Sequence, residues 1–189
     1  MSASEDASAL GREFNSGILE TVEFRGETTV RVSSASFRPV MTWCRDQLGY
    51  AMLLDVSSVD HFGEEPRFEM VYELATLDDS RHLRVKMAVS EEESVPTVSD
   101  LWAAADWHER EVWDMMGIPF SGHPNLKRIL MWEGYPFYPL RKDFPLAGRP
   151  SDMPDVAFSG VAPLAGGPFV TSPGAADTIR REPRSREME

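Results

Sequence analysis

The sequence contains one cysteine, more acidic than basic residues, and no long apolar run. A single cysteine, Cys44, excludes an internal disulfide, a CxxC motif and an iron–sulfur cluster ligated by this chain alone. The net charge of -12 excludes general nucleic-acid binding, which needs a basic surface. Spanning a bilayer takes a run of ~18 apolar residues, and secretion takes a basic and apolar leader. We therefore expect no direct membrane insertion, and a protein that is cytosolic or attached to a partner from the cytosolic side.

The patterns that are present predict an α/β fold of the α+β type, a two-layer sandwich of a mixed sheet with helices. Hydrophobic residues make up 42% of the chain, enough for a buried core. Residues 67–76 and 82–89 alternate apolar and charged side chains, which is typical of strands with one buried face. Glutamates of the first strand are expected to pair with basic residues of the second. The predicted order α-β-β-α-β-β-β-α has helices near 7–15, at 36–48 and at 99–116, and strands at 17–24, 28–32, 51–62, 67–76 and 82–89.

Local signals mark the ends and turns of these elements. Gly26 lies between the first two predicted strands and favours a β-hairpin. Cys44 falls within a helical pattern, where a small buried residue is expected. Ser99 or Asp100 is suited to cap the last helix, and Gly117 to end it.

The chain changes character after Gly117. Eleven of its 14 prolines lie at or beyond Pro119, and the formal charge reverses over residues 126–149, with five bases against two acids. Such a composition favours extended backbone over a packed core. We therefore predict four regions: an N-terminal segment (1–16), an α/β domain (17–117), a docking segment rich in proline and aromatic residues (118–147), and an extended C-terminal tail (148–189).

The stretch "DWHEREVWDMMGIPFSGHPNLKR" at 106–128 concentrates acids, histidines and arginines, and it admits several interpretations. His108, Glu111 and His123 could bind a metal in a small hydrolase, although Val112 stands where the HExxH motif has its second histidine. Two further arrangements are open. One is a carboxylate group for acid–base catalysis (Glu109, Glu111, Asp114), and the other is an internal ladder of ion pairs (Asp106, Arg110, Asp114).

The stretch "YPFYPLRKDFPL" at 135–146 favours a surface that binds another protein. Tyr135, Tyr138 and Phe144 each precede a proline, which restricts them to extended geometry. A stiff segment that presents aromatic and arginine side chains loses little entropy on binding and offers the usual anchors of an interface.

Two stretches of the chain resemble a known family. "EREVWDMMGIPFSGHPNLKRIL" at 109–130 and "PLRKDFPL" at 139–146 resemble the 30 kDa subunit of respiratory complex I, which is the C subunit of NADH:quinone oxidoreductase. The residues taken as the family signature and as interface candidates are Glu109, Arg110, Glu111, Asp114, His123, Lys127, Arg128, Tyr138, Arg141, Lys142 and Asp143.

The resemblance implies an accessory subunit of a proton-translocating NADH:quinone oxidoreductase. Such a subunit binds no cofactor and has no activity alone, because FMN and the iron–sulfur clusters lie on partner subunits. It docks in the peripheral arm, chiefly on the 49 kDa subunit (D) and also near B and I, on the cytoplasmic side of the cell inner membrane. The equivalent subunit of a membrane-bound hydrogenase or of another quinone dehydrogenase is the alternative, and neighbouring genes would distinguish the two.

Overall fold

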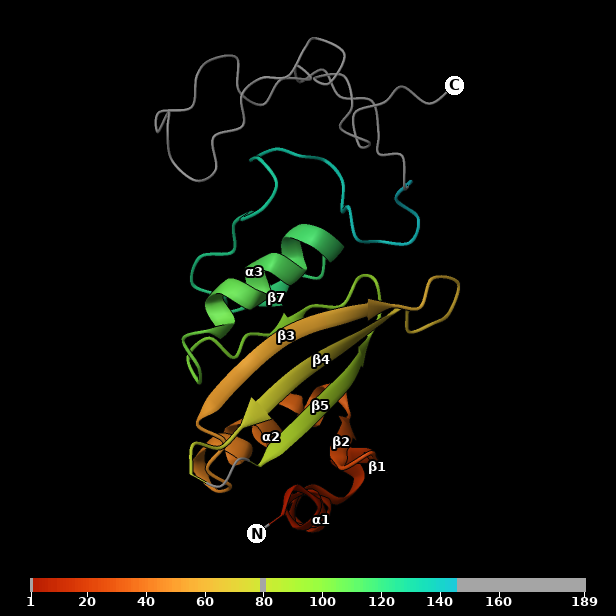
Figure 1. Ribbon diagram of the computed structural model, residues 1–189. Coiled ribbons are helices and arrows are strands. Elements are labelled where there is room, and N and C mark those ends of the chain that lie inside the picture. The colour runs from red at the N-terminus through yellow and green to blue at the C-terminus, as the bar shows by residue number, and fades with distance from the viewer. Residues whose placement is uncertain (1, 79–80, 146–189) are drawn as a thin grey trace, which may run out of the picture. The chain divides into compact units, whose positions relative to one another are not determined.

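The computed structural model describes residues 2–78 and 81–145. The chain divides into two compact units, Met1–Arg141 and Lys142–Glu189, and only residues 142–145 of the second are described. Every helix and strand of the described residues lies in the first unit (Figure 1). The predicted C-terminal tail at 148–189 lies outside the described residues.

The predicted element order is confirmed, with two short strands in addition. The helices are α1 (Ala3–Phe14), α2 (Ser34–Asp46) and α3 (Ala105–Met116), with a 3-10 turn at Asn15–Gly17. The strands are β1 (Ile18–Phe24), β2 (Glu27–Val32), β3 (Met52–Asp60), β4 (Phe68–Ala75), β5 (His82–Val89), β6 (Val95–Pro96) and β7 (Phe120–Ser121). The sequence did not predict β6 and β7, because two residues are too few to show alternation.

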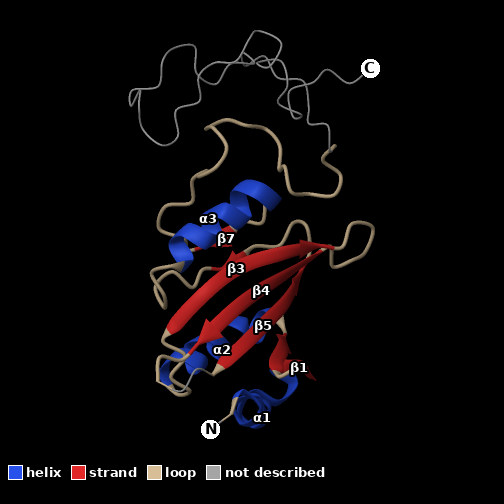
Figure 2. Cartoon of the chain, viewed as in Figure 1, coloured by secondary structure: helices blue, strands red, loops and turns tan. Residues whose placement is uncertain are grey.

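Five strands form one mixed sheet in the order β1-β2-β5-β4-β3, in which β2 and β5 are parallel and the other pairs antiparallel (Figure 2). The expected alternation places Phe68, Met70, Tyr72 and Leu74 on one buried face. Phe37 of α2 packs against Tyr72, with ring centroids 4.9 Å apart, so α2 covers this face. The predicted α+β architecture is therefore confirmed.

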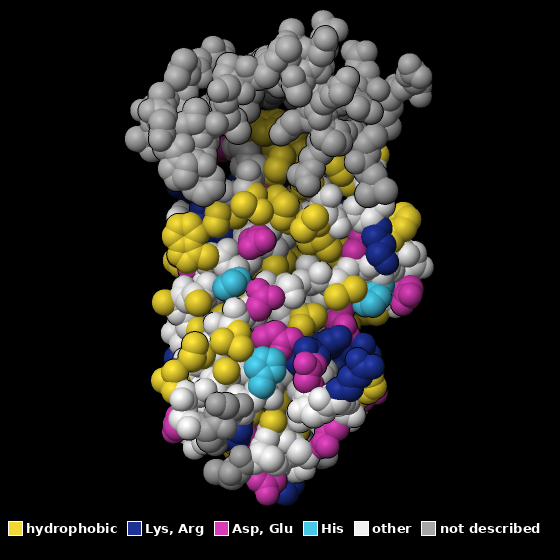
Figure 3. Space-filling view, in the orientation of Figure 1, with side chains coloured by type: hydrophobic (Ala, Val, Ile, Leu, Met, Phe, Trp, Pro, Cys, Tyr) yellow, Lys and Arg dark blue, Asp and Glu magenta, His cyan; other side chains and the backbone are white. Residues whose placement is uncertain are grey.

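The opposite face of the sheet carries the expected cross-strand ion pairs. Lys86 Nζ lies 2.8 Å from Glu69 Oε2, and Arg84 pairs with Glu73. Arg31 of β2 also binds Glu69, which extends the lattice to a third strand. Figure 3 shows acidic and basic side chains lying next to one another on the side of the molecule turned to the viewer. Each pair stabilises the sheet by a few tenths of a kcal/mol, so their main effect is to keep this face polar.

The predicted hairpin is closed by a two-residue turn at Arg25 and Gly26. Both residues have positive φ, 52° and 84°, and the strand pair Phe24–Glu27 flanks them. Positive φ at both central positions defines a type I′ turn, whose twist matches that of antiparallel strands. This turn fixes the register of β1 against β2.

The last helix begins later than predicted. Its N-cap is Ala104, without a side-chain cap, instead of Ser99 or Asp100. The Asp100 carboxylate pairs with Arg38 of α2, and the Ser99 hydroxyl is hydrogen-bonded with the Thr97 hydroxyl at 2.9 Å. Because both capping side chains have other partners, residues 98–104 form turns before the helix starts.

The expectation for Cys44 is confirmed: its side chain is fully buried in α2. Burial, with a smaller effect from Asp6, raises the pKa of the thiol to about 12. We predict that Cys44 does not react with a thiol reagent at pH 8 until the protein unfolds, since the thiolate is the nucleophile. The measurement is the labelling rate in native buffer and in denaturant. An Ala35→Cys variant, exposed on the same helix, is the positive control. Equal native rates at the two positions would contradict the prediction.

Candidate functional site

The site is built around Asp114, near the C-terminal end of α3. Its carboxylate is completely buried, and one oxygen accepts hydrogen bonds from the backbone N–H groups of Ile129, Leu130 and Met131 at 2.7–2.9 Å. The other oxygen pairs with Arg128. Burial alone would raise the pKa of Asp114, but these four donors lower it below its usual value. The ionised carboxylate therefore holds residues 128–131 against the helix.

Arg128 extends this hold to the aromatic part of the segment. Its guanidinium donates to the carbonyls of Asp114 and Tyr135, and lies 5.4–5.7 Å from the ring centroids of Trp113, Tyr135 and Tyr138. The planar, weakly hydrated guanidinium suits a site between aromatic rings. A loop without regular secondary structure is thereby fixed to α3.

Arg141 closes the segment at its far end. It donates to the Met116 carbonyl at 2.6 Å and pairs with Glu91 at 2.7 Å, while Tyr138 stacks on it at 4.6 Å. These contacts pass over Gly117, where φ is +75° and an added Cβ would lie 2.6 Å from the Tyr138 ring. Glycine is thus required at position 117 for conformation and for space.

Glu91 connects the segment to the main sheet. Its second carboxylate oxygen lies 3.1 Å from the guanidinium of Arg67, whose side chain is buried. Arg67 also forms a bidentate ion pair with Asp60 at the end of β3. The chain of contacts from Asp60 through Arg67 and Glu91 to Arg141 ties the core of the domain to residue 141. Sequence reasoning missed Glu91 and the packing over Gly117, because neither belongs to a local pattern.

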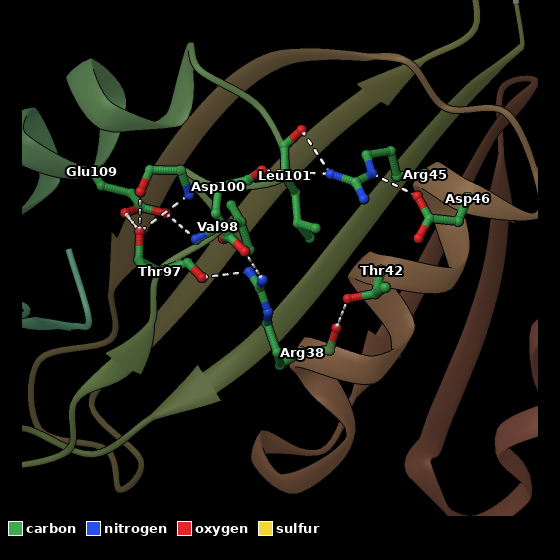
Figure 4. Close-up of polar contacts among 10 residues, drawn as sticks. Arg38, Thr42, Arg45, Asp46, Thr97, Val98, Asp100, Leu101 and Glu109 are labelled. Atoms are coloured by element: carbon green, nitrogen blue, oxygen red, sulfur yellow. Dashed lines mark hydrogen bonds and ion pairs between the residues drawn. The ribbon is translucent and has the colours of Figure 1, made fainter. Parts of the chain in front are cut away.

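A second buried carboxylate, Glu109, holds the loop that leads into α3. Its oxygens accept from the Val98 N–H at 2.7 Å and from the Thr97 hydroxyl (Figure 4). Arg38 of α2 donates to the Thr97 carbonyl and pairs with Asp100, so α2, this loop and α3 meet there. Burial raises the pKa of Glu109 to about 7, in spite of the two hydrogen bonds that lower it.

His123 joins the docking segment to the same carboxylate. Its side chain is completely buried, with Nε2 3.2 Å from an Asp106 oxygen and 3.8 Å from a Glu109 oxygen. Nδ1 accepts the Asn125 N–H, so Nε2 carries the proton and donates it to the Asp106 carbonyl at 3.1 Å. Just before it, β7 pairs in parallel with β6. His123 therefore positions the start of the segment.

The predicted ladder of Asp106, Arg110 and Asp114 does not form. Arg110 donates instead to the carbonyls of Lys127 and Arg128 at 3.1 and 3.3 Å, and lies over the Trp107 ring. The two acids are drawn to other partners, because His123 and Arg128 approach them from the returning segment.

The metal and acid–base hypotheses fail on geometry. His108 faces Asp55 of β3 at 3.3 Å, His123 is buried on another side of α3, and Glu111 is exposed. No group of three possible ligands occurs among the described residues. Glu109 and Asp114 each have their own partners, so the carboxylates of the helix form no shared acid–base group.

The remaining signature residues divide by exposure. Lys127, Lys142 and Asp143 are exposed, while Tyr138 is partly buried against Arg141. The same part of the chain carries four large apolar side chains with exposed fractions of 44–61%: Trp107, Leu130, Trp132 and Leu140. The buried members of the signature thus hold the segment after α3 in place, and large apolar side chains of that segment are exposed to water. That these residues meet another subunit stays a prediction.

None of the helices in residues 2–78 and 81–145 is long and apolar enough to cross a membrane.

Comparison with known proteins gives a consistent result. Residues 30–150 match the family model described as "Respiratory-chain NADH dehydrogenase, 30 Kd subunit". The chain is 44% identical to the C subunit of NADH-quinone oxidoreductase from Citrifermentans bemidjiense over 140 residues, 74% of this chain and 87% of that protein. It is 47% identical to the C subunit from Paramagnetospirillum magneticum over 125 residues, 65% of this chain and 63% of that protein.

A solved structure shares the fold. A chain of the membrane-bound sulfane sulfur reductase, an archaeal respiratory membrane complex, aligns with a TM-score of 0.66 at 24% identity. The alignment covers 76% of this chain and 85% of that one.

We predict that Gly117→Ala loosens the segment from α3, since the new Cβ displaces Tyr138 and Arg141. Gly134→Ala is the matched control, because Gly134 also has positive φ, 87°, but has no atoms within 4 Å. Both variants pay about 1 kcal/mol of backbone strain, and only Gly117→Ala loses the packing, for a total of about 2–4 kcal/mol. Chemical denaturation measures the stability, and limited trypsin digestion after Arg128 and Arg141 reports the loosening. Equal effects in the two variants would show that the contact is unimportant.

We also predict a pH dependence from Glu109. Because its pKa in the folded protein is about 7, above the ordinary value near 4.3, the folded state holds the proton longer than the unfolded state. Stability therefore falls as pH rises from about 4.3 to about 7, by on the order of 3 kcal/mol in full. Glu109→Gln should flatten this part of the profile, while Glu111→Gln, at an exposed position, should not. Urea denaturation between pH 4.5 and 8 measures the free energy of unfolding. The same slope of this free energy against pH in the wild type and in both variants would disprove the prediction.

Proposed function

Because the chain belongs to the family of the 30 kDa subunit of respiratory-chain NADH dehydrogenase, we propose that it docks against the 49 kDa (D) subunit in the peripheral arm of an NADH:quinone oxidoreductase. Residues 118–141 form the docking surface in this proposal. The chain supports electron transfer from NADH to quinone by holding neighbouring subunits in place, and takes no part in the chemistry itself.

One observation carries the proposal: the docking segment is rigidly held but apolar on its outside. Its backbone is fixed by Asp114, Arg128 and Arg141, yet Leu130, Trp132 and Leu140 remain 61%, 44% and 61% exposed. A stable fold does not need a pre-ordered loop that presents large apolar groups to water. Such a loop gives up little entropy on binding, which is the usual advantage of a pre-organised interface.

The buried polar groups then have a supporting role in the proposal. Asp114 and Glu109 lie too deep to touch a partner, and Arg128 and Arg141 use their charges within the chain. Contact with the D subunit falls to the apolar side chains and to exposed Glu111 and Lys127. In this proposal the buried signature residues hold the docking segment in its shape, and other side chains make the contacts with the partner.

The proposal assigns the cofactors to other subunits. Cys44 is the one cysteine, and its burial in α2 removes it from any cluster. FMN and the iron–sulfur clusters then belong to partners, with B and I as further neighbours of this chain. The complex places the chain at the cytoplasmic side of the inner membrane as a peripheral subunit, without catalytic activity when isolated.

A related assembly is the second candidate, and the fold shared with the chain from the sulfane sulfur reductase complex favours it. The subunits that co-purify with a tagged chain distinguish the two. Flavin- and NADH-binding subunits support the first candidate, and hydrogenase-type subunits support the second.

We predict that replacing Leu130 and Trp132 by serine reduces the amount of the chain retained on membranes at least tenfold. Buried anchors of this size each contribute about 1–2 kcal/mol or more to an interface. NADH:quinone reductase activity of the same membranes should fall in parallel.

The matched control is Leu77→Ser. Leu77 is 69% exposed in the connection after β4, away from the docking segment. Leu77→Ser and a single Leu130→Ser variant should keep the melting temperature of the isolated chain, because these side chains are 69% and 61% exposed. The double variant should melt slightly lower, because Trp132 is 44% exposed and its ring centroid lies 4.5 Å from that of Tyr135. Full retention of the double variant would refute the docking role.

A further inference from the structure

The β1 strand forms an open edge of the main sheet. Every residue from Leu19 to Phe24 is exposed, and Leu19, Val22 and Phe24 have exposed fractions of 64%, 41% and 65%. At the other edge, β3 lies along α3 (Figures 1 and 2). α1 contacts β1 as well, but it leaves every side chain from Leu19 to Phe24 exposed, so the apolar groups of this edge face water.

The backbone of β1 offers hydrogen bonds at known positions. The type I′ turn makes Phe24 and Glu27 a hydrogen-bonded pair, so Val22 and Thr29 are the next such pair. The amides of Thr21 and Glu23 lie between these pairs and point away from β2. An incoming strand would find donors and acceptors there, spaced as in any sheet.

The charges of the edge favour one kind of partner. Glu20 pairs with Arg31 at 3.6 Å and Glu27 with Arg84 at 3.0 Å, whereas Glu23 has no ion pair among residues 2–78 and 81–145. A second copy of the chain that paired antiparallel about Glu23 would set this glutamate against its twin, and like charges facing each other across strands destabilise the pair. The net charge of -12 opposes self-association as well. A basic partner relieves this charge.

We infer that β1 is a strand-addition site for an extended segment of another polypeptide in which apolar residues alternate with lysine or arginine. The segment lengthens the sheet beyond β1 through the amides of Thr21 and Glu23. Its apolar side chains cover Val22 and Phe24, and its basic side chains meet Glu23. Since β1 and β3, which contacts α3, lie at opposite ends of the sheet order, this site stays open while the docking segment is occupied.

Photocrosslinking on the full chain tests the site. Phe24 is replaced by the photoreactive p-benzoyl-phenylalanine, also an aromatic residue, in a tagged chain expressed in its own cells. Membranes are irradiated and the adduct is mapped by mass spectrometry. We expect adducts within one basic, extended segment of another protein. Phe62, 57% exposed in the loop after β3, is the control position and should give no such adduct.

Two proline variants separate edge pairing from simple contact. Thr21→Pro removes an outward donor and keeps every bond to β2, because proline is tolerated on the free side of an edge strand. It should lower the Phe24 adduct at least tenfold, with the melting temperature of the purified chain unchanged within about 3 °C. Val22→Pro removes a donor to β2 and should lower the melting temperature itself.

A charge variant tests the partner's chemistry without touching the backbone. Glu23→Lys should lower the adduct at least fivefold, while Glu64→Lys, at another exposed glutamate, should not. Retention of the chain on the same membranes reports the docking segment independently, so failure of one proposal is distinguishable from failure of the other. The inference is overturned by the absence of an adduct, by an adduct to β1 of a second copy, by an adduct to an acidic segment, or by an unchanged yield in Thr21→Pro and Glu23→Lys.

Discussion

The hydrogen bonds received by the Asp114 carboxylate fix the middle of the segment that follows α3, from Arg128 to Met131. Three consecutive backbone N–H groups and one guanidinium converge on this buried group. Backbone amides buried in a loop need acceptors, and an irregular segment cannot supply them from itself. A charged acceptor forms stronger hydrogen bonds than a carbonyl. With this carboxylate in place, Arg128 can order the aromatic rings and Arg141 can close the segment.

Glu109 performs the same task for the entry into the helix, but with the opposite electrostatic result. Two hydrogen bonds do not offset its burial, and its pKa rises to about 7, whereas four donors lower that of Asp114. The two acids lie on the same helix and differ in the number of donors they receive. Helix α3 thus carries one carboxylate that stays ionised, Asp114, and one that titrates near neutral pH, Glu109.

The sequence predicted the main sheet and its helices because their signals are local. Alternation in β4 and β5 and the helical spacing around Cys44 are enforced by one buried face each. Prediction failed where residues far apart in the chain compete for one partner. Asp100 has a side chain suited to cap a helix, but Arg38, 62 residues away in the chain, binds its carboxylate. Arg110 has the spacing of an ion-pair ladder, but the carbonyls of Lys127 and Arg128 bind it. The signature residues were recognised by spacing alone, and their burial was not visible in that spacing.

Because β2 pairs in parallel with β5, the main sheet cannot be completed until β5 has been synthesised. The β1–β2 hairpin forms locally, but its neighbour in the sheet starts at His82, after residues 33–81 have been made. Until β5 has left the ribosome, the inner edge of β2 has no partner strand, and its apolar side chains Val30 and Val32 lack their final packing. Non-local pairing of this kind slows folding and leaves strand edges open to aggregation. Before β5 is made, the nascent chain therefore contains two separate antiparallel strand pairs, β1–β2 and β3–β4, and no completed sheet. This is the period in which a chaperone would have most to protect.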